Sequence, residues 1–248
     1  MSYERAVTRR GERQQLQLPV EVQCRESSDF GWTRTAELLD VTPFGARLRI
    51  PHPTEPGRLI QISLPMPREL RCYDHNEERY VVWALVRHIK SIDGETDRAP
   101  QCEIGVAFVG KEPPPGFEED PSRRYNLQPP DSKDNLWKVE DAADKPETED
   151  SRERRTEERH KVEDDILIEV YDADGNVISR ELAKTENISR HGMSVLTTLN
   201  IVRGRYVRVR SAYYKMAVIA AVRRLRRGND GSRHLHLEFV DQQWPPLE

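Results

Sequence analysis

The sequence lacks the features that mark secreted, disulfide-bonded and membrane-spanning proteins. It has 248 residues but only three cysteines, Cys24, Cys72 and Cys102, and none lies in a C-x-x-C pair. An odd number without that spacing argues against a disulfide framework and against a zinc site. No apolar stretch approaches the length of a membrane span, and the charged N-terminus has no apolar signal core. We therefore expect a cytoplasmic protein without membrane insertion.

The chain also lacks the motifs of the common enzyme classes. No G-x-S-x-G, P-loop, G-x-G-x-x-G or H-E-x-x-H pattern occurs. His234 and His236 alternate on one predicted strand, but the sequence ties no third metal ligand to them. We predict that the protein is not an enzyme and has no catalytic residues, no metal and no cofactor.

Composition indicates small domains with much surface. Apolar residues make up 36% of the chain and charged residues 33%, and the formal net charge is only −4. The length suits two domains of ordinary size. Because the net charge is small, the molecule as a whole does not attract nucleic acid or anionic membranes.

Both halves show the period-two alternation of half-buried β-strands. It covers residues 16–22, 46–50, 60–64 and 102–108 in the first half, and residues 166–170, 207–209 and 235–239 in the second. Longer apolar runs at 80–86 and 216–222 are typical of central strands, and a short helix is expected near 117–125. Many short strands separated by turn signals predict a small barrel or sandwich in each half.

Between the halves lies a segment that cannot build a core. Residues 120–150 are rich in Asp, Glu, Lys and Pro. Trp137, with Leu136 and Val139, forms an apolar island there, and we expect it to contact a neighbouring domain rather than to serve as a binding peptide. The predicted organisation is an N-terminal domain over 1–118, an acidic linker over 119–149 and a C-terminal domain over 150–248.

Two short motifs occur twice, in the same order. Each copy has R-x-x-x-R followed by an acidic or amide residue, a hydroxyl residue and a glycine. The second arginine precedes the Asp or Asn by 27 positions in the first copy and by 28 in the second. The residues are Arg9, Arg13, Asp40, Thr42 and Gly45 in the first copy, and Arg155, Arg159, Asn187, Ser189 and Gly192 in the second. Such parallel spacing indicates a duplicated module.

The residue types suit a small anionic ligand with a guanine ring. The guanidinium fork donates paired hydrogen bonds to phosphate oxygens or to guanine O6 and N7, and it stays charged at any working pH. Each arginine pair precedes the first strand of its repeat, so it can fold over a ligand held on the barrel wall. The second motif offers an acceptor, a hydroxyl and a glycine that lets a flat ring approach the backbone.

These residues resemble the signature of the PilZ domain, a bacterial receptor family for the second messenger cyclic di-GMP. The resemblance covers both repeats, roughly residues 5–115 and 150–244. It implies an all-β protein with two tandem six-stranded antiparallel barrels joined by the acidic linker. It also implies that the two motif sets bind cyclic di-GMP, and that the neighbouring Arg10 and Arg154 add phosphate contacts.

The first copy departs from the family pattern. Thr42 replaces serine and adds a methyl group, while Pro43 removes a backbone N–H and stiffens the turn. We therefore rank the second site above the first. In the second copy, Glu157 and Glu158 lie between the arginines and compete for their guanidinium groups when ligand is absent.

Two alternatives stay open beside the receptor hypothesis. Degenerate barrels that no longer bind nucleotide would act as an adaptor for a partner protein. A less favoured hypothesis assigns nucleic-acid binding to the basic block from Ile201 to His236, whose default interpretation is a solvated outer face or a wider positive field around the ligand. The downstream partner is unknown, and a homodimer is left open.

Overall fold

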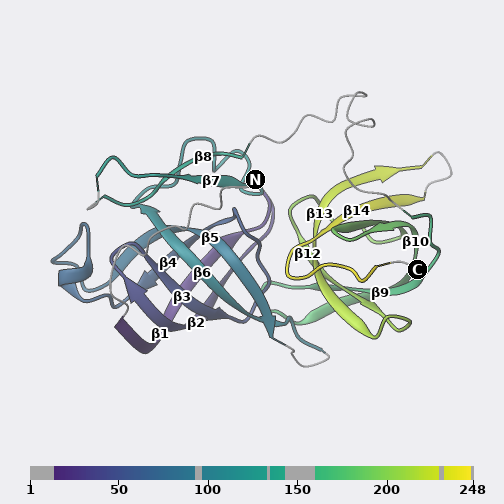
Figure 1. Ribbon diagram of the computed structural model, residues 1–248, viewed down its shortest axis with the longest axis horizontal. Helices are drawn as coiled ribbons and strands as arrows, with labels where there is room; N and C mark the ends of the chain where they lie inside the picture. The colour runs from purple at the N-terminus through teal and green to yellow at the C-terminus, as the bar shows by residue number, and fades with distance from the viewer. Residues whose placement is uncertain (1–13, 93–96, 133–134, 143–159, 229–231, 247–248) are drawn as a thin grey trace.

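Two β-barrels lie side by side along the long axis of the molecule (Figure 1). The computed structural model describes residues 14–92, 97–132, 135–142, 160–228 and 232–246. Within those residues the regular structure is all β, apart from one 3-10 turn, η1, at Arg68–Leu70.

The first barrel closes in the order β1-β2-β3-β6-β5-β4, with antiparallel neighbours. Its strands are β1 Gln14–Arg25, β2 Gly31–Thr42, β3 Gly45–Ile50, β4 Leu59–Leu64, β5 Tyr80–Ile92 and β6 Gln101–Gly110.

The second barrel has the same topology. Read around the barrel from β9, its order is β9-β10-β11-β14-β13-β12. Its strands are β9 Asp165–Tyr171, β10 Val177–Ser189, β11 Gly192–Thr197, β12 Tyr206–Ser211, β13 Met216–Arg227 and β14 Arg233–Phe239. The predicted fold of two six-stranded antiparallel barrels is therefore confirmed.

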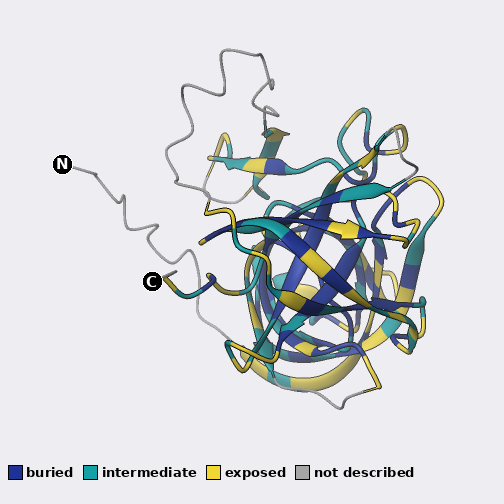
Figure 2. Cartoon of the chain, turned by 90° about the vertical axis from the view of Figure 1, so that its right-hand side faces the viewer, coloured by how far each residue is buried: buried dark blue, intermediate teal, exposed yellow. Residues whose placement is uncertain are grey.

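The alternation seen in the sequence becomes the inside and outside of each barrel. On β3, Ala46, Leu48 and Ile50 are buried while Arg47 and Arg49 face outward. Figure 2 shows the same change between buried and exposed residues along the strands of the second barrel. Successive side chains of a strand point to opposite faces, so this pattern fills one core per barrel.

The segment predicted as a linker contains a folded hairpin. β7 Tyr125–Gln128 pairs with β8 Lys138–Asp141, and Leu127 and Val139 pack on a small apolar cluster around Phe117. The backbone N–H of Trp137 donates to the carbonyl of Phe108 at 3.0 Å. The apolar island thus contacts the first barrel, as predicted.

The helix expected near 117–125 does not form. Turns occupy residues 115–119 and 121–122, and β7 then begins at Tyr125. Gly116 has a φ of +79°, outside the helical region, and Pro121 has no N–H to donate. The apolar residues here face the first barrel instead.

The interface between the barrels combines apolar packing with buried charge. Tyr206, Ile219 and Ala221 belong to the second barrel but pack into the core of the first. Beside them Arg58, fully buried, donates from Nη2 to Oε1 of Glu55 at 2.7 Å and from Nε to the Tyr206 hydroxyl at 3.0 Å. The two barrels therefore share one continuous packed region.

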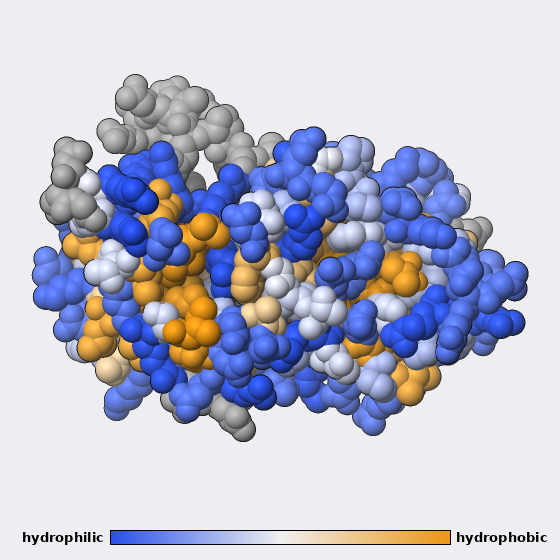
Figure 3. Space-filling view, turned by 180° about the vertical axis from the view of Figure 1, so that it is seen from behind, coloured by the Kyte–Doolittle hydropathy of each residue, from blue (hydrophilic) through white to orange (hydrophobic). Residues whose placement is uncertain are grey.

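The outer surface is mainly hydrophilic, with apolar patches that are more extensive over the second barrel in the rear view (Figure 3). Ile178 and Leu182 on β10 are among the exposed large apolar side chains. No helix among the described residues is long and apolar enough to cross a membrane. All three cysteines are free, and Cys24 and Cys102 are buried.

Glu26 is a buried carboxylate at the interface. It accepts from Nε1 of Trp32 at 3.0 Å and from Nε of Arg205 at 3.1 Å. Burial raises the pKa of Glu26 to about 7, although Arg205 and Arg58 oppose the rise. Burial also lowers the pKa of His52 to about 4, so its ring is neutral at pH 7. Its Nδ1 lies 3.4 Å from Oε1 of Glu26, and this contact is therefore not an ion pair.

We expect the pH dependence of stability to change in Glu26→Gln. Because the pKa of Glu26 is higher in the folded state than in the unfolded chain, its contribution is fully present below about pH 4.5 and is lost as pH rises through about 7. Relative to Glu26→Gln, the wild-type free energy of unfolding should fall by on the order of 3 kcal/mol between pH 5 and pH 8.

Urea denaturation of both proteins at the two pH values measures this difference. His52 titrates in the opposite sense, but it is present in both proteins and cancels in the comparison. Parallel pH profiles for wild type and Glu26→Gln would show that Glu26 keeps an ordinary pKa.

Candidate functional site

The hydroxyl residue of each motif closes the turn between two strands. The Ser189 hydroxyl donates to the carbonyl of Gly192 at 3.2 Å, and the Thr42 hydroxyl donates to the carbonyl of Gly45 at the same distance. In the first barrel the backbone N–H of Phe44 also donates to Thr42 Oγ1 at 3.2 Å. Threonine therefore keeps the turn bond that serine makes.

The motif glycines stand where a neighbouring strand comes close. A Cβ on Gly45 would lie 2.3 Å from the carbonyl oxygen of Val106, and a Cβ on Gly192 would lie 2.3 Å from that of Leu237. Any other residue would push β3 from β6, or β11 from β14. The sequence suggested that this glycine lets a ligand ring approach. The structure shows that both barrels also need glycine here because the backbone of the neighbouring strand leaves no room for a Cβ.

The predicted arginines lie outside the described residues, but the residues that follow them do not. These arginines are Arg9, Arg10, Arg13, Arg154, Arg155 and Arg159. In the second barrel, His160 and Ile188 exchange two backbone hydrogen bonds of 3.0 Å. In the first, Gln14 pairs with Val41. In both copies, the residue after the arginine pair is therefore the strand partner of the residue between the Asp or Asn and the hydroxyl residue.

The acceptor residues of the two motifs differ in their surroundings. Asp40 is buried, and its Oδ2 accepts from Nε of Arg47 at 2.8 Å. Asn187 occupies the equivalent position beside Ser194, and within the described part of the chain its side chain makes no hydrogen bond. The first motif thus presents a paired carboxylate, and the second an amide.

Glu186 organises polar groups beside the second motif. It accepts from the hydroxyl of Ser194 at 2.8 Å and lies 3.0 Å from Nδ1 of His234. Burial alone would raise the pKa of Glu186, but its bonds to His234 and Ser194 hold it below the usual value. Sequence reasoning did not connect His234 to Glu186, because a β-bulge at Glu186 sets their alignment.

A chain of ion pairs runs from the second turn to the first barrel. Glu238 is the strand partner of Gly192, and its Oε2 accepts from Nε of Arg223 at 2.6 Å. Arg223 also binds both carboxylate oxygens of Glu55 in the first barrel. Arg124, from the segment between the barrels, contacts Glu238 at 3.2 Å. Although burial opposes it, Arg58 and Arg223 lower the pKa of Glu55 to about 2, so Glu55 is charged at neutral pH.

The basic block divides into two groups. Arg203, Lys215, Arg224, Arg226 and Arg227 are exposed, as expected for a solvated outer face, whereas Arg205, Arg208, Arg210 and Arg223 make ion pairs within the protein. Arg208 and Arg210 lie on one face of β12, as the alternation predicted, and both bind Glu169 together with Arg180. Although burial acts to raise it, these arginines lower the pKa of Glu169. Among the described residues no group of His, Cys, Asp and Glu could hold a metal ion.

Comparison with known families identifies the class of the second barrel. The second barrel has six strands, and a backbone bridge joins its Asn-Ile-Ser turn to His160, the residue after Arg159. The PilZ domain family matches residues 153–243, and this part of the chain is a PilZ domain. Since the first barrel repeats its topology and turn bonds, the predicted resemblance to tandem PilZ-domain proteins is confirmed.

Three solved structures illustrate the likeness of the whole chain. Inhibitor of motility (MotI/DgrA) of Bacillus subtilis is 12% identical, with 92% of this chain and 90% of that chain covered and a TM-score of 0.31. PlzA of Borreliella burgdorferi in complex with c-di-GMP is 9% identical, with coverages of 93% and 87% and a TM-score of 0.27. YcgR of Escherichia coli in complex with c-di-GMP is 12% identical, with coverages of 90% and 75% and a TM-score of 0.29.

Likeness at these TM-scores does not bear on the ligand of this chain. No curated protein matches it in sequence. Any assignment of function therefore depends on the PilZ match of the second barrel and on the geometry of its motif.

Proposed function

We propose that the protein is a non-enzymatic cytoplasmic receptor that binds cyclic di-GMP at its second barrel. The proposed ligand-binding residues are Arg154, Arg155, Arg159, Asn187, Ser189 and Gly192. The observation that supports the proposal is the His160–Ile188 bridge, because it holds His160, which directly follows Arg159 in the sequence, beside the turn that contains Asn187 and Ser189. A guanine held against that turn is then within reach of the preceding arginines.

The first motif set, Arg9, Arg10, Arg13, Asp40, Thr42 and Gly45, ranks behind the second as a ligand site. Its aspartate is already paired with Arg47. In this proposal the N-terminal domain, residues 1–118, acts mainly through its interface with the C-terminal domain, residues 150–248. The segment 119–149 joins them and contributes Arg124 to the contact with Glu238.

We further propose that ligand binding changes how the barrels are held together. Gly192 pairs with Glu238, and Glu238 reaches Glu55 of the first barrel through Arg223. A dianionic ligand near the turn competes with Glu238 for Arg223, and so weakens or redirects its link to the first barrel. A downstream protein partner would then bind to the altered arrangement of the barrels.

Titration of the purified full chain with cyclic di-GMP tests the receptor proposal. Calorimetry should show saturable binding that Arg159→Ala removes, and small-angle scattering of the saturated sample should differ from that of the free protein. A wild-type chain that gives no binding heat would contradict the receptor proposal. An unchanged scattering curve at saturation would contradict only the proposed rearrangement of the barrels.

A further inference from the structure

The two barrels carry different residues at one equivalent position beside the motif. In the β2–β3 pair, Asp40 lies opposite Arg47, and a register shift separates this pair from the preceding one. In the β10–β11 pair, Asn187 lies opposite Ser194, again after a register shift. The two positions therefore have equivalent strand partners and follow equivalent bulges, and they differ only in their side chains.

In the first barrel this position supplies a cation to the motif. Arg47 is bonded from Nε to Oδ2 of Asp40 at 2.8 Å, and the Asp40 side chain is only 6% exposed while that of Arg47 is 43% exposed. A carboxylate so enclosed accepts strongly from a charged donor. Because the guanidinium already occupies Oδ2, an incoming guanine N–H has to compete with it for the carboxylate and to fit beside the half-exposed arginine side chain.

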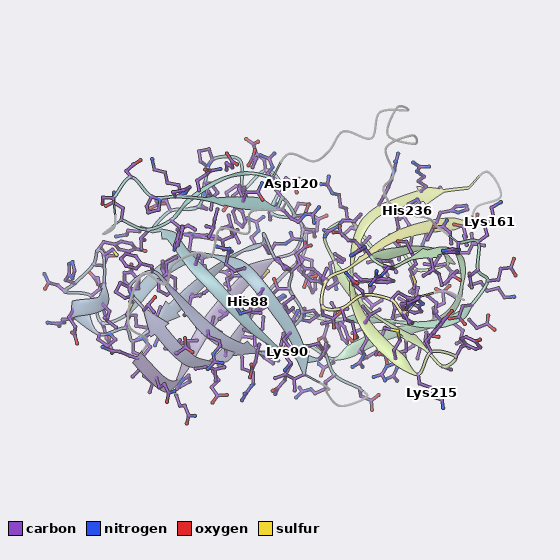
Figure 4. All side chains as sticks on the ribbon, viewed as in Figure 1. His88, Lys90, Asp120, Lys161, Lys215 and His236 are labelled. Atoms are coloured by element: carbon purple, nitrogen blue, oxygen red, sulfur yellow. The ribbon has the colours of Figure 1, made fainter. Side chains whose placement is uncertain are left out.

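The next strand also differs between the two barrels. Gly105 on β6 lies opposite Arg47, and the ring of His88 from β5 covers it, since a Cβ on Gly105 would lie 1.9 Å from Cε1 of His88. In the second barrel His236 on β14 takes the position of Gly105 opposite Ser194. His88 and His236 are labelled on their strands in Figure 4.

In the second barrel the residue at the same position is bonded to Glu186 and makes no ion pair with the motif. The hydroxyl of Ser194 donates to Glu186, which His234 also contacts, so the serine is held toward these neighbours. Serine is also too short to span the turn as Arg47 does. The carbonyl and amide of Asn187 can therefore meet a ligand without first losing an ion pair.

We infer that the residue opposite the motif Asp or Asn selects which barrel binds: Arg47 closes the first site from within, and Ser194 leaves the second open. This inference rests on the proposed function, because it concerns occupancy of the same ligand. It predicts that the wild-type chain binds cyclic di-GMP through the second barrel alone.

Reciprocal substitutions test the inference by calorimetry with cyclic di-GMP on the full chain. Arg47→Ser, placed in an Arg159→Ala background, should restore saturable binding by opening the first barrel. Ser194→Arg in the wild-type background should weaken binding by at least about tenfold, because it gives the second barrel the cation of the first.

Matched controls lie two residues further along the same strands. Arg49→Ser removes an equally placed arginine whose partners are Glu37 and Glu103, and it should restore nothing in the Arg159→Ala background. Leu196→Arg introduces the same charge at a partly exposed position of β11 and should leave the affinity within about twofold of wild type.

The outcomes separate this inference from the receptor proposal. If the wild-type chain binds and Arg159→Ala does not, the receptor proposal stands, and failure of Arg47→Ser to restore binding overturns the inference. If Arg47→Ser weakens wild-type binding, Arg47 contacts the ligand and the inference is also overturned. Because Ser194 is buried, Ser194→Arg is checked for folding by its melting curve. If Ser194→Arg unfolds, the test depends on Arg47→Ser, because Arg47 has a half-exposed side chain whose replacement should leave the fold intact.

Discussion

Arg159→Ala should abolish measurable binding of cyclic di-GMP under conditions that saturate the wild-type protein. Arg159 directly precedes His160, which is bonded to Ile188 of the turn, so Arg159 is the motif arginine nearest in sequence to the turn contact. Losing two charge-assisted hydrogen bonds to phosphate or guanine costs about 3 kcal/mol or more, which is a weakening of roughly 100-fold. Calorimetric titration measures the change.

Arg13→Ala is the matched control for this variant. Arg13 precedes Gln14 just as Arg159 precedes His160, and Gln14 pairs with the first turn. If the ligand binds at the second barrel, Arg13→Ala should bind like wild type. Equal affinities for Arg159→Ala and wild type would refute the role of the second arm, and loss of binding in Arg13→Ala alone would move the site to the first barrel.

Arg58→Ala should produce the largest loss of stability of any single substitution considered. Arg58 is fully buried and donates to the Glu55 carboxylate, the Tyr206 hydroxyl, and the backbone carbonyls of Pro121 and Gly204. The variant leaves Glu55 as a buried charge with one fewer cation and leaves a cavity between the barrels. Breaking a buried ion pair of this kind costs about 3 to 5 kcal/mol.

Urea denaturation of Arg58→Ala beside Arg79→Ala isolates the effect of burial. Arg79 also makes two side-chain hydrogen bonds, to the hydroxyl and carbonyl of Ser63, but it is exposed. Its removal should change the free energy of unfolding by no more than about 1 kcal/mol. If Arg58→Ala lost no more stability than Arg79→Ala, the buried network would not hold the barrels together.

The barrels were predictable because their strands are amphipathic in a regular way. Alternation at 46–50 and 235–239, and the apolar run at 80–86, each mark a strand that fills a core. The long strand β10 was harder to predict, because Ile178 and Leu182 on its outer face are apolar and exposed. The β7–β8 hairpin was missed because its charged sequence covers only a small apolar cluster.

The candidate site was predictable only as far as the repeated motif extends. Spacing aligned the two copies, and comparing the residue two places after each glycine, Arg47 and Ser194, would have exposed their difference. The contacts made by the residues around the site could not be predicted from the sequence. The partners of Glu186 depend on a bulge, and the interface of Arg58 with Tyr206 joins residues 148 positions apart. Neither leaves a local pattern in the sequence.

The most direct test of the account is backbone hydrogen exchange of the full chain with and without cyclic di-GMP. We propose that the ligand binds against the second turn, beside His160. Exchange should therefore slow at the amides of His160 and of residues 187–192 when ligand is bound, while residues 40–45 of the first barrel keep their rates. Slowing at 40–45, or no slowing at 187–192 with saturating ligand, would contradict the claim.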